Sequence, residues 1–158
     1  MVYVLLGEGF EETEAIVPTD LLRRAGVPVS LVGLESLQVT GAHGINVLAD
    51  LTLDQANSEG MEMLVLPGGL GGVESIQMNL FAQALIQEAS NRGCWLGAIC
   101  AAPTILAHMG ILDRRRAVCY PGMEEEMGSA VAATGCEKPG YLPVRRRQNC
   151  RHRRGSAL

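Results

Sequence analysis

Short apolar runs alternate with longer segments of helical periodicity along most of the chain. Runs that are almost entirely apolar are typical of strands buried on both faces, whereas apolar residues three or four positions apart indicate an amphipathic helix. The strands expected from such runs are 2–6, 27–32, 61–66, 94–99 and 117–120, with a further short one at 131–134. The helices expected between them are 12–24, 52–58, 73–91 and 101–109.

Two short apolar segments, 37–40 and 45–49, are separated by Gly41 and Gly44, and this arrangement predicts a β-hairpin. The longer pattern, in which helices alternate with nearly all-apolar strands, predicts a parallel sheet covered on both faces. The expected fold class is therefore α/β. In such folds ligands bind at the carboxyl ends of the strands.

Three of these strand ends carry residues suited to chemistry. The segment 11–14, which reads Glu-Glu-Thr-Glu, follows the first strand. Pro67-Gly68-Gly69 follows the strand at 61–66, and Cys100 follows the strand at 94–99. The sequence therefore predicts a site in which carboxyl groups, backbone amides and a thiol come together.

Composition and charge narrow the class of protein. The 158 residues are 47% hydrophobic, which predicts a globular domain with a core. Six of the 13 basic residues lie at 145–154, so seven remain against 17 acidic residues in 1–144, a net charge of −10. This acidic body argues against nucleic acid as a partner.

The chain shows no sign of export or membrane insertion. No apolar run is long enough to span a bilayer, and the N-terminus lacks the basic segment of a signal peptide. The five cysteines show neither CxxC nor Cys/His metal spacing, so we expect no metal site. A reduced, cytoplasmic protein is the simplest expectation.

Cys100 ends an apolar run and is followed at once by small residues and Pro103. This order predicts a thiol at a sharp turn between a strand and a helix that begins at Ala101. Backbone N–H groups at the start of a helix favour the thiolate over the thiol, so we expect a reactive cysteine. An inert buried thiol is the alternative interpretation.

A reactive thiol also needs donors for a developing oxyanion and a group that handles the proton. Gly68 and Gly69 lack side chains, so their N–H groups can approach a bound oxygen, and the N–H of Ala101 lies beside the thiol. One of the early glutamates could supply a carboxyl, which donates a hydrogen bond when protonated and acts as a base when ionised. The alternative is an ordinary glutamate in the first turn of a helix.

These residues belong to motifs that resemble the ThiJ/PfpI family, which includes the Parkinsonism-associated deglycase. The motifs occur in the family's order and spacing over about residues 1–135: Gly9-Phe10-Glu11-Glu12-Thr13-Glu14-Ala15, Leu22-Arg23-Arg24-Ala25-Gly26, Val65-Leu66-Pro67-Gly68-Gly69 and Ala98-Ile99-Cys100-Ala101-Ala102-Pro103. The resemblance implies a flavodoxin-like three-layer sandwich with a mostly parallel sheet, related to class I glutamine amidotransferases. It also implies a homodimer that works without a cofactor.

The resemblance assigns roles to particular residues. Cys100 matches the nucleophile, which is readily oxidised to sulfinic acid, and Glu14 matches the glutamate that contacts it. The backbone of Gly68, Gly69 and Ala101 matches the oxyanion pocket. Glu11 and Glu12 are then expected to be ordinary first-turn residues.

The family's activities include a glyoxalase that turns methylglyoxal into lactate, removal of early glycation adducts, redox sensing and chaperone activity. We therefore expect a stress-protection protein in which Cys100 attacks reactive aldehydes such as methylglyoxal. The alternative is a peroxide-responsive redox sensor or chaperone with little turnover.

Two further residues are accessory candidates. By the resemblance, many family members place a histidine near the nucleophile. Tyr120 stands at a position where some of them carry it, so no Cys-His-acid triad is visible and peptidase activity is not expected. The Tyr120 hydroxyl can still donate a hydrogen bond. His43, in the predicted hairpin loop, either reaches the cleft of its own or a partner subunit or is a solvated loop histidine.

The C-terminal segment departs from the family. The family places a further strand and a long helix there, whereas residues 145–158 contain six arginines and show neither period. We therefore expect a family domain at 1–144, an Arg-rich irregular tail at 145–158, and no C-terminal strand or helix. A frameshift would explain the tail, because CGN arginine codons read one base on become GNC codons for Val, Ala, Asp or Gly; resequencing the gene tests this.

Overall fold

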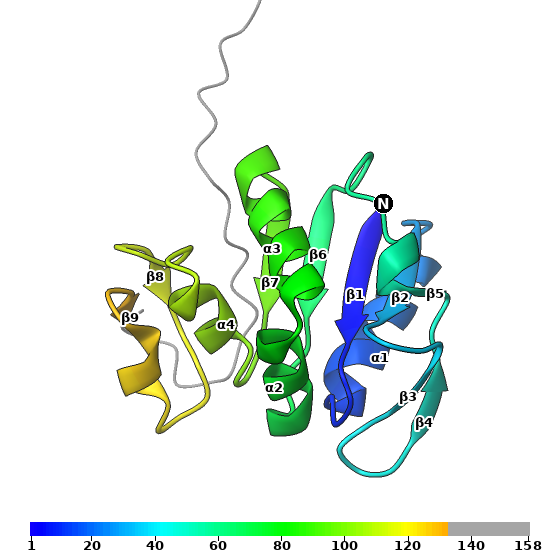
Figure 1. Ribbon diagram of the computed structural model, residues 1–158, viewed down its shortest axis with the longest axis horizontal. Helices are drawn as coiled ribbons and strands as arrows, with labels where there is room; N and C mark the ends of the chain where they lie inside the picture. The colour runs from blue at the N-terminus through cyan, green and yellow to red at the C-terminus, as the bar shows by residue number, and fades with distance from the viewer. Residues whose placement is uncertain (133–158) are drawn as a thin grey trace, which may run out of the picture.

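A five-stranded parallel sheet forms the centre of the computed structural model, which describes residues 1–132 (Figure 1). The strand order is β5-β2-β1-β6-β7. The bounds are Val2–Leu6 for β1, Val29–Gly33 for β2, Leu51–Thr52 for β5, Met63–Leu66 for β6 and Trp95–Ala98 for β7. All four pairs of neighbouring strands in this sheet are parallel, as the alternation of strands and helices predicts.

Helices cover both faces of the sheet and make three layers. Helix α1 (Glu12–Arg24) packs on one face, whereas α2 (Leu70–Met78), α3 (Leu80–Arg92) and α4 (Pro103–His108) pack on the other. Figure 1 shows α2 and α3 on the opposite side of the sheet from α1. The predicted α/β, flavodoxin-like class with a mostly parallel sheet is confirmed.

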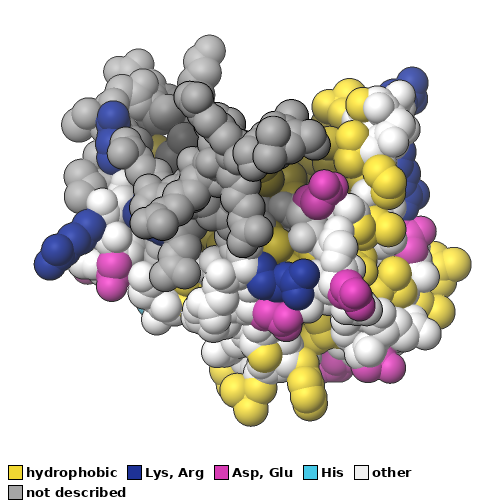
Figure 2. Space-filling model, turned by 90° about the horizontal axis from the view of Figure 1, so that it is seen from above, with side chains coloured by type: hydrophobic (Ala, Val, Ile, Leu, Met, Phe, Trp, Pro, Cys, Tyr) yellow, Lys and Arg dark blue, Asp and Glu magenta, His cyan; other side chains and the backbone are white. Residues whose placement is uncertain are grey.

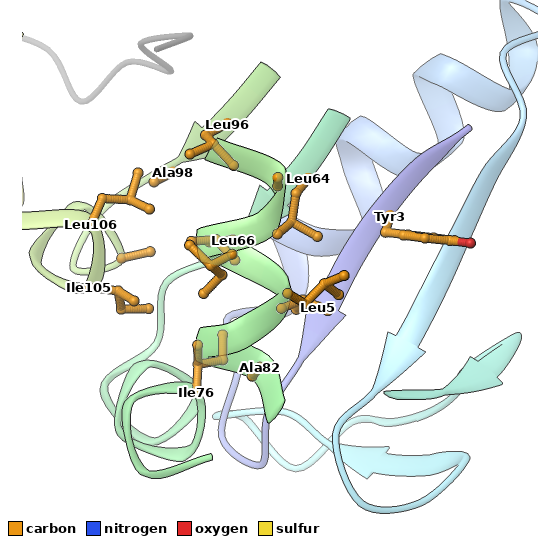
Figure 3. Packing of buried hydrophobic residues seen from close by; sticks show 14 of the residues in the cluster. Tyr3, Leu5, Leu64, Leu66, Ile76, Ala82, Leu96, Ala98, Ile105 and Leu106 are labelled. Carbon is orange, nitrogen blue, oxygen red and sulfur yellow. The ribbon is translucent and has the colours of Figure 1, made fainter. Parts of the chain in front are cut away.

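Alternation along each strand divides the core into two clusters. In β1, Tyr3 and Leu5 point towards α2, α3 and α4, whereas Val4 and Leu6 point towards α1. Figure 3 shows Leu5, Leu64 and Leu66 on the side that meets these three helices. Because both faces of β1 and β6 are buried, these two strands carry hydrophobic residues at every position.

Short elements complete the described part of the chain. The expected hairpin is confirmed as β3 (Gln38–Thr40) and β4 (Asn46–Leu48), which pair antiparallel. The expected helix at 52–58 is reduced to one 3₁₀ turn, η1 (Leu53–Gln55). Beyond α4 lie β8 (Arg116–Ala117), the 3₁₀ turn η2 (Glu124–Met127) and β9 (Val131–Ala132), and β8 pairs with β9 in parallel.

The helix predicted at 73–91 is two helices, and Asn79 separates them. Its backbone is extended (φ −96°, ψ 107°), and its side-chain Oδ1 accepts hydrogen bonds from the N–H groups of Phe81 and Ala82, each at 3.0 Å. Asparagine is a favoured N-cap residue because its side chain satisfies amides that lack a partner in the first turn. The apolar periodicity continues through this break, so the hydrophobic pattern alone predicts one long helix.

Hydrophobic side chains also reach the surface in several places (Figure 2). Met78, Leu80 and Phe81, at the junction of α2 and α3, are each more than three quarters exposed. Within residues 1–132 no helix has the length and apolar character needed to cross a bilayer. The expected boundary at 144, the Arg-rich tail and the expected loss of the C-terminal strand and helix lie outside the described residues.

Candidate functional site

Three neighbouring strands, β1, β6 and β7, end at the same edge of the sheet, and the loops that follow them meet there. The loop after β1 is tied to the loop after β6 by the Glu11 N–H, which donates to the Gly68 carbonyl at 2.9 Å. A Cβ placed on Gly68 would lie 2.6 Å from Glu14 Oε2 and 2.7 Å from Cys100 Cβ. The structure therefore brings together the three strand ends that the sequence singles out.

Cys100 occupies a sharp turn in the left-handed region, with φ 59°. Few residues other than glycine adopt this conformation, and strained backbone of this kind clusters at functional sites. The turn is held on one side by the Ile99 N–H, which donates to the Leu66 carbonyl at 3.3 Å, and on the other by the Ala102 N–H, which donates to Ile99. The thiol is thus fixed at the carboxyl end of β7 and is partly exposed.

Glu14, in the first turn of α1, reaches this thiol. Its Oε2 accepts a hydrogen bond from the Gly68 N–H at 2.7 Å, and its carboxyl is hydrogen-bonded to the Cys100 side chain. Glu11 caps the same helix by accepting the Glu14 N–H at 2.7 Å, which fixes the start of α1. Burial raises the pKa of the Glu14 carboxyl, and the neighbouring charge of Glu11 adds to this effect.

The expectation of a simply lowered thiol pKa needs correction. Burial and the nearby Glu14 carboxylate raise the pKa of the Cys100 thiol, whereas the N–H groups of Ala101 and Gly69 lower it. Helix α4 begins at Pro103 rather than at Ala101, so individual amides, not the end of a helix, face the sulfur. The Glu14 carboxylate therefore raises the cost of ionising the Cys100 thiol, and the thiol hydrogen-bonds to that carboxyl, so the two groups are expected to influence each other's titration.

The three backbone amides expected at the oxyanion pocket differ in what they contact. The N–H groups of Gly69 and Ala101 hydrogen-bond to the Cys100 sulfur. The N–H of Gly68 instead donates to Glu14 and therefore holds the carboxyl rather than facing the thiol. The arrangement leaves two amides near the sulfur, where charge would develop on the oxygen of a carbonyl group whose carbon becomes bonded to the sulfur.

Gly69 is expected to be intolerant of any side chain. Its φ of +85° is unfavourable for other residues, and an added Cβ would lie 2.4 Å from the Gly9 carbonyl oxygen and 2.6 Å from the Glu11 nitrogen. We expect Gly69→Ala to destabilise the fold by about 2–5 kcal/mol in urea unfolding, which combines backbone strain with overpacking. Gly26→Ala is the matched control, since Gly26 has φ +75° and no atom within 4 Å of the added Cβ. Its expected cost is about 1–2 kcal/mol, and an equal loss in both variants would contradict the close approach at Gly69.

The backbone of Tyr120 lies beside that of Cys100, the candidate nucleophile. Its N–H donates to the Cys100 carbonyl at 2.7 Å, which fixes the segment after β8 against the turn. The Tyr120 side chain is 54% exposed. The Tyr120 backbone thus borders the site, and its accessory role remains a prediction.

His43 contacts a different glutamate. It lies in the turn between β3 and β4, where its Nδ1 is 2.8 Å from Glu12 Oε2 and its backbone N–H donates to Glu12 Oε1 at 2.8 Å. Glu12 is buried and joins this turn to α1, a role that its place in a first helical turn does not indicate. Glu12 and Glu14 are two positions apart in α1, so their side chains project from different sides of the helix. The bond joins residues 31 positions apart, and no local sequence signal reveals it.

The Glu12–His43 contact should make stability depend on acid pH. Burial alone would raise the pKa of Glu12, but hydrogen bonds from His43 and Ile45 hold it at about 2, below its ordinary 4.5. Stabilisation from the ionised Glu12 is present above about pH 4.5 and is lost as the pH falls towards about 2. We expect Glu12→Gln to flatten the loss of stability over this range in pH-dependent urea unfolding. Glu74→Gln, at an exposed position of α2, should keep the wild-type slope; a wild-type slope in Glu12→Gln would contradict the assignment.

Potential metal ligands converge at one place within residues 1–132. One ligand atom from each of Glu11, Glu12 and His43 lies within 4.8 Å of the others. Glu12 already accepts hydrogen bonds from His43, and Glu11 caps α1, so these groups have structural partners. We assign no metal to this cluster.

The geometry agrees with comparison to known proteins. The sequence profile described as the DJ-1/PfpI family matches residues 1–148. The chain belongs to this family. DJ-1/PfpI is the ThiJ/PfpI family that the sequence motifs resemble, so the resemblance is confirmed.

Individual relatives support the assignment. Protein dj-1beta of Drosophila melanogaster is 36% identical over 125 residues, which cover 78% of this chain and 67% of that protein. A deglycase of Pyrococcus horikoshii is 35% identical over 129 residues, covering 82% and 77% of the two chains. A crystal structure of a mutant DJ-1 superfamily protein from Salmonella typhimurium aligns with TM-score 0.80 and 33% identity, over 84% of this chain and 73% of the other.

Proposed function

We propose that this DJ-1/PfpI family member detoxifies reactive aldehydes such as methylglyoxal, with Cys100 as nucleophile. The observation that carries the proposal is the Cys100 thiol at a left-handed turn, hydrogen-bonded to the Glu14 carboxyl and to the amides of Gly69 and Ala101. These are a nucleophile, a proton carrier and oxyanion donors within reach of one another. Deglycase-named relatives at about 35% identity support the same class of chemistry.

The reaction can be written with this site alone and water. The Cys100 thiolate adds to the aldehyde carbon, and the new oxyanion is held by the amides of Gly69 and Ala101 before taking the proton from Glu14. The product is a hemithioacetal. The Glu14 carboxylate then removes the proton from the former aldehyde carbon while the adjacent ketone oxygen takes up a proton, which gives an enediol. Return of the proton to the adjacent carbon, with loss of the proton from the first hydroxyl, yields the thioester of lactate. Water hydrolyses the thioester, releases lactate and regenerates the thiol.

A direct test is to incubate the reduced protein with methylglyoxal and assay lactate, in parallel with an early glycation adduct on a model peptide. The proposal expects lactate formation that needs no added metal or cofactor. Release of the unmodified peptide amine would extend the proposal to deglycation. No lactate and no release, from a protein with native circular dichroism, would contradict it.

A second candidate function is a peroxide-responsive sensor or chaperone with little turnover. One observation favours low turnover: among residues 1–132, none of the groups that raise or lower the pKa of Cys100 is a histidine, and His43 is bonded to Glu12 instead. In this case the sulfinate of oxidised Cys100 would be held by protonated Glu14 and the same amides. A stress phenotype that requires Cys100, without turnover of any aldehyde, would favour this candidate.

We also propose a homodimer in a reducing, cytoplasmic setting. Val17 and Leu21 of α1 are about half exposed and, with Met63 and Val65, line an entirely apolar groove. A second subunit is a suitable cover for such a surface. The cysteines described within residues 1–132 are free thiols, which suits a reducing compartment.

A further inference from the structure

A second cysteine lies next to the nucleophile. The hydrogen bond from the Tyr120 N–H to the Cys100 carbonyl, 2.7 Å long, brings the preceding residue, Cys119, close to Cys100. The bonded nitrogen and oxygen each lie about 2.4 Å from the α-carbons of Cys119 and Cys100, so these α-carbons are at most about 7.5 Å apart. Disulfides usually join α-carbons about 4.4–6.8 Å apart, a range that lies within this upper bound, so the backbone contact is compatible with a disulfide.

The surroundings of Cys119 allow the two sulfurs to meet. Both thiols are free and partly exposed, and both pack against the same core cluster. Cys119 lies in an irregular segment between β8 and η2 that also contains Gly122, with φ 93°. We expect rotation about the Cα–Cβ bonds and an adjustment of this irregular segment to bring the two sulfurs together.

Cys94, the other cysteine described within residues 1–132, has no such relation to the nucleophile. It precedes β7 whereas Cys100 follows it, so about 20 Å of extended strand separates them. The Cys94 thiol is buried and donates to the Met61 carbonyl at 3.1 Å. Cys94 therefore provides an internal control for any oxidation that depends on position.

We propose that Cys119 is the resolving cysteine of Cys100 and that the two form a reversible disulfide when a peroxide oxidises the site. The Cys100 thiolate attacks the peroxide, takes one oxygen to become a sulfenic acid, and releases the alcohol or water. The Cys119 sulfur then attacks the sulfenic sulfur, loses its proton and expels hydroxide, which together form water. Two electrons pass from the two thiols to the peroxide.

The groups around the two thiols favour first oxidation at Cys100. Burial and the carboxylates of Glu124 and Glu126 raise the pKa of the Cys119 thiol. At Cys100 the N–H groups of Ala101 and Gly69 contact the sulfur and oppose the effect of burial and Glu14. The disulfide would stop Cys100 from proceeding to the sulfinic acid, which thiols do not reduce. A thiol reductant would then restore both the nucleophile and its neighbour.

The test is peptide mapping of the full chain after brief treatment with hydrogen peroxide and blocking of the remaining thiols. We expect a linked Cys100–Cys119 peptide pair that has lost two hydrogen atoms and disappears on reduction with dithiothreitol. In Cys119→Ser, Cys100 should instead gain two oxygen atoms that dithiothreitol cannot remove. Cys94→Ala should form the disulfide as the wild type does.

Other outcomes overturn the proposal. A wild-type Cys100 that becomes a sulfinate while Cys119 remains free to alkylate would do so, as would a bond from Cys100 to Cys94, Cys136 or Cys150. The disulfide is independent of aldehyde turnover. A protein that makes lactate but never links Cys100 to Cys119 would refute the disulfide alone, and a linked protein without turnover would refute only the proposed enzymatic function.

Discussion

Replacing Cys100 with serine is expected to abolish lactate formation from methylglyoxal, with kcat/KM falling by at least about 10³-fold. Serine keeps the size of the side chain and a donor for the Glu14 carboxyl, so the turn should survive. What is lost is the nucleophile, because a serine hydroxyl without a strong base is far less nucleophilic than a thiolate.

Cys94→Ser is the matched control for this substitution. Cys94 is a buried thiol that donates to a backbone acceptor, the Met61 carbonyl, and it lies at the other end of β7 from Cys100. We expect this variant to keep its activity, provided that thermal unfolding shows a native fold. Lactate production that persists in Cys100→Ser would contradict a covalent role for the thiol.

Replacing Glu14 with glutamine is expected to lower kcat for lactate formation by about 10²–10³-fold, the usual contribution of a positioned acid–base group. The glutamine oxygen can still accept the Gly68 N–H, so the loop contact is retained while the proton carrier is removed. Glu35→Gln, at an exposed loop position, should leave kcat unchanged.

A second readout separates catalysis from structure in the Glu14 variant. The Glu14 charge is among the causes that raise the pKa of Cys100, so removing it should lower that pKa. We therefore expect the pH profile of Cys100 alkylation to shift to lower pH in Glu14→Gln even though turnover falls. Parallel loss of alkylation and turnover would indicate structural damage and contradict the proton-transfer role.

Local sequence patterns anticipate the parts of this structure that depend on local order. The apolar strands, the hairpin around Gly41 and Gly44, and the positions of Gly68 and Cys100 after their strands all follow from periodicity and the ends of parallel strands. Motifs in family order then indicate which of the early glutamates reaches the thiol. These features depend on neighbours in sequence or on the fixed geometry of a parallel sheet.

Features that depend on contacts distant in sequence are not visible in this way. The burial of Glu12 against His43 links residues 31 positions apart, and the first turn of α1 gives no hint of it. The sequence suggests that the Gly68 N–H could face a bound oxygen, but in the fold this N–H donates to the Glu14 carboxyl. The pKa of Cys100 depends on the balance between burial, which raises it, and the amides of Ala101 and Gly69, which lower it. Only the three-dimensional packing determines this balance.

The apolar pattern does not predict the break between α2 and α3 at Asn79, although a local sequence signal for it exists. Asparagine is a strong N-cap residue, and its side chain caps Phe81 and Ala82 as such a signal implies. The apolar period runs from α2 into α3 without interruption, so periodicity alone favours one long helix. A strong capping residue inside a long predicted helix therefore indicates a possible helix boundary, even where the apolar period continues.

The proposed function requires that the fold make Cys100 a distinct, accessible and reactive thiol. Iodoacetamide alkylation of each cysteine, followed by peptide mass spectrometry in the folded protein and in urea, measures this property. We expect folded protein to be alkylated at Cys100 well before Cys94 and Cys119, and urea to remove this preference. An unreactive Cys100 in folded protein, or equal rates at all three positions, would contradict this expectation.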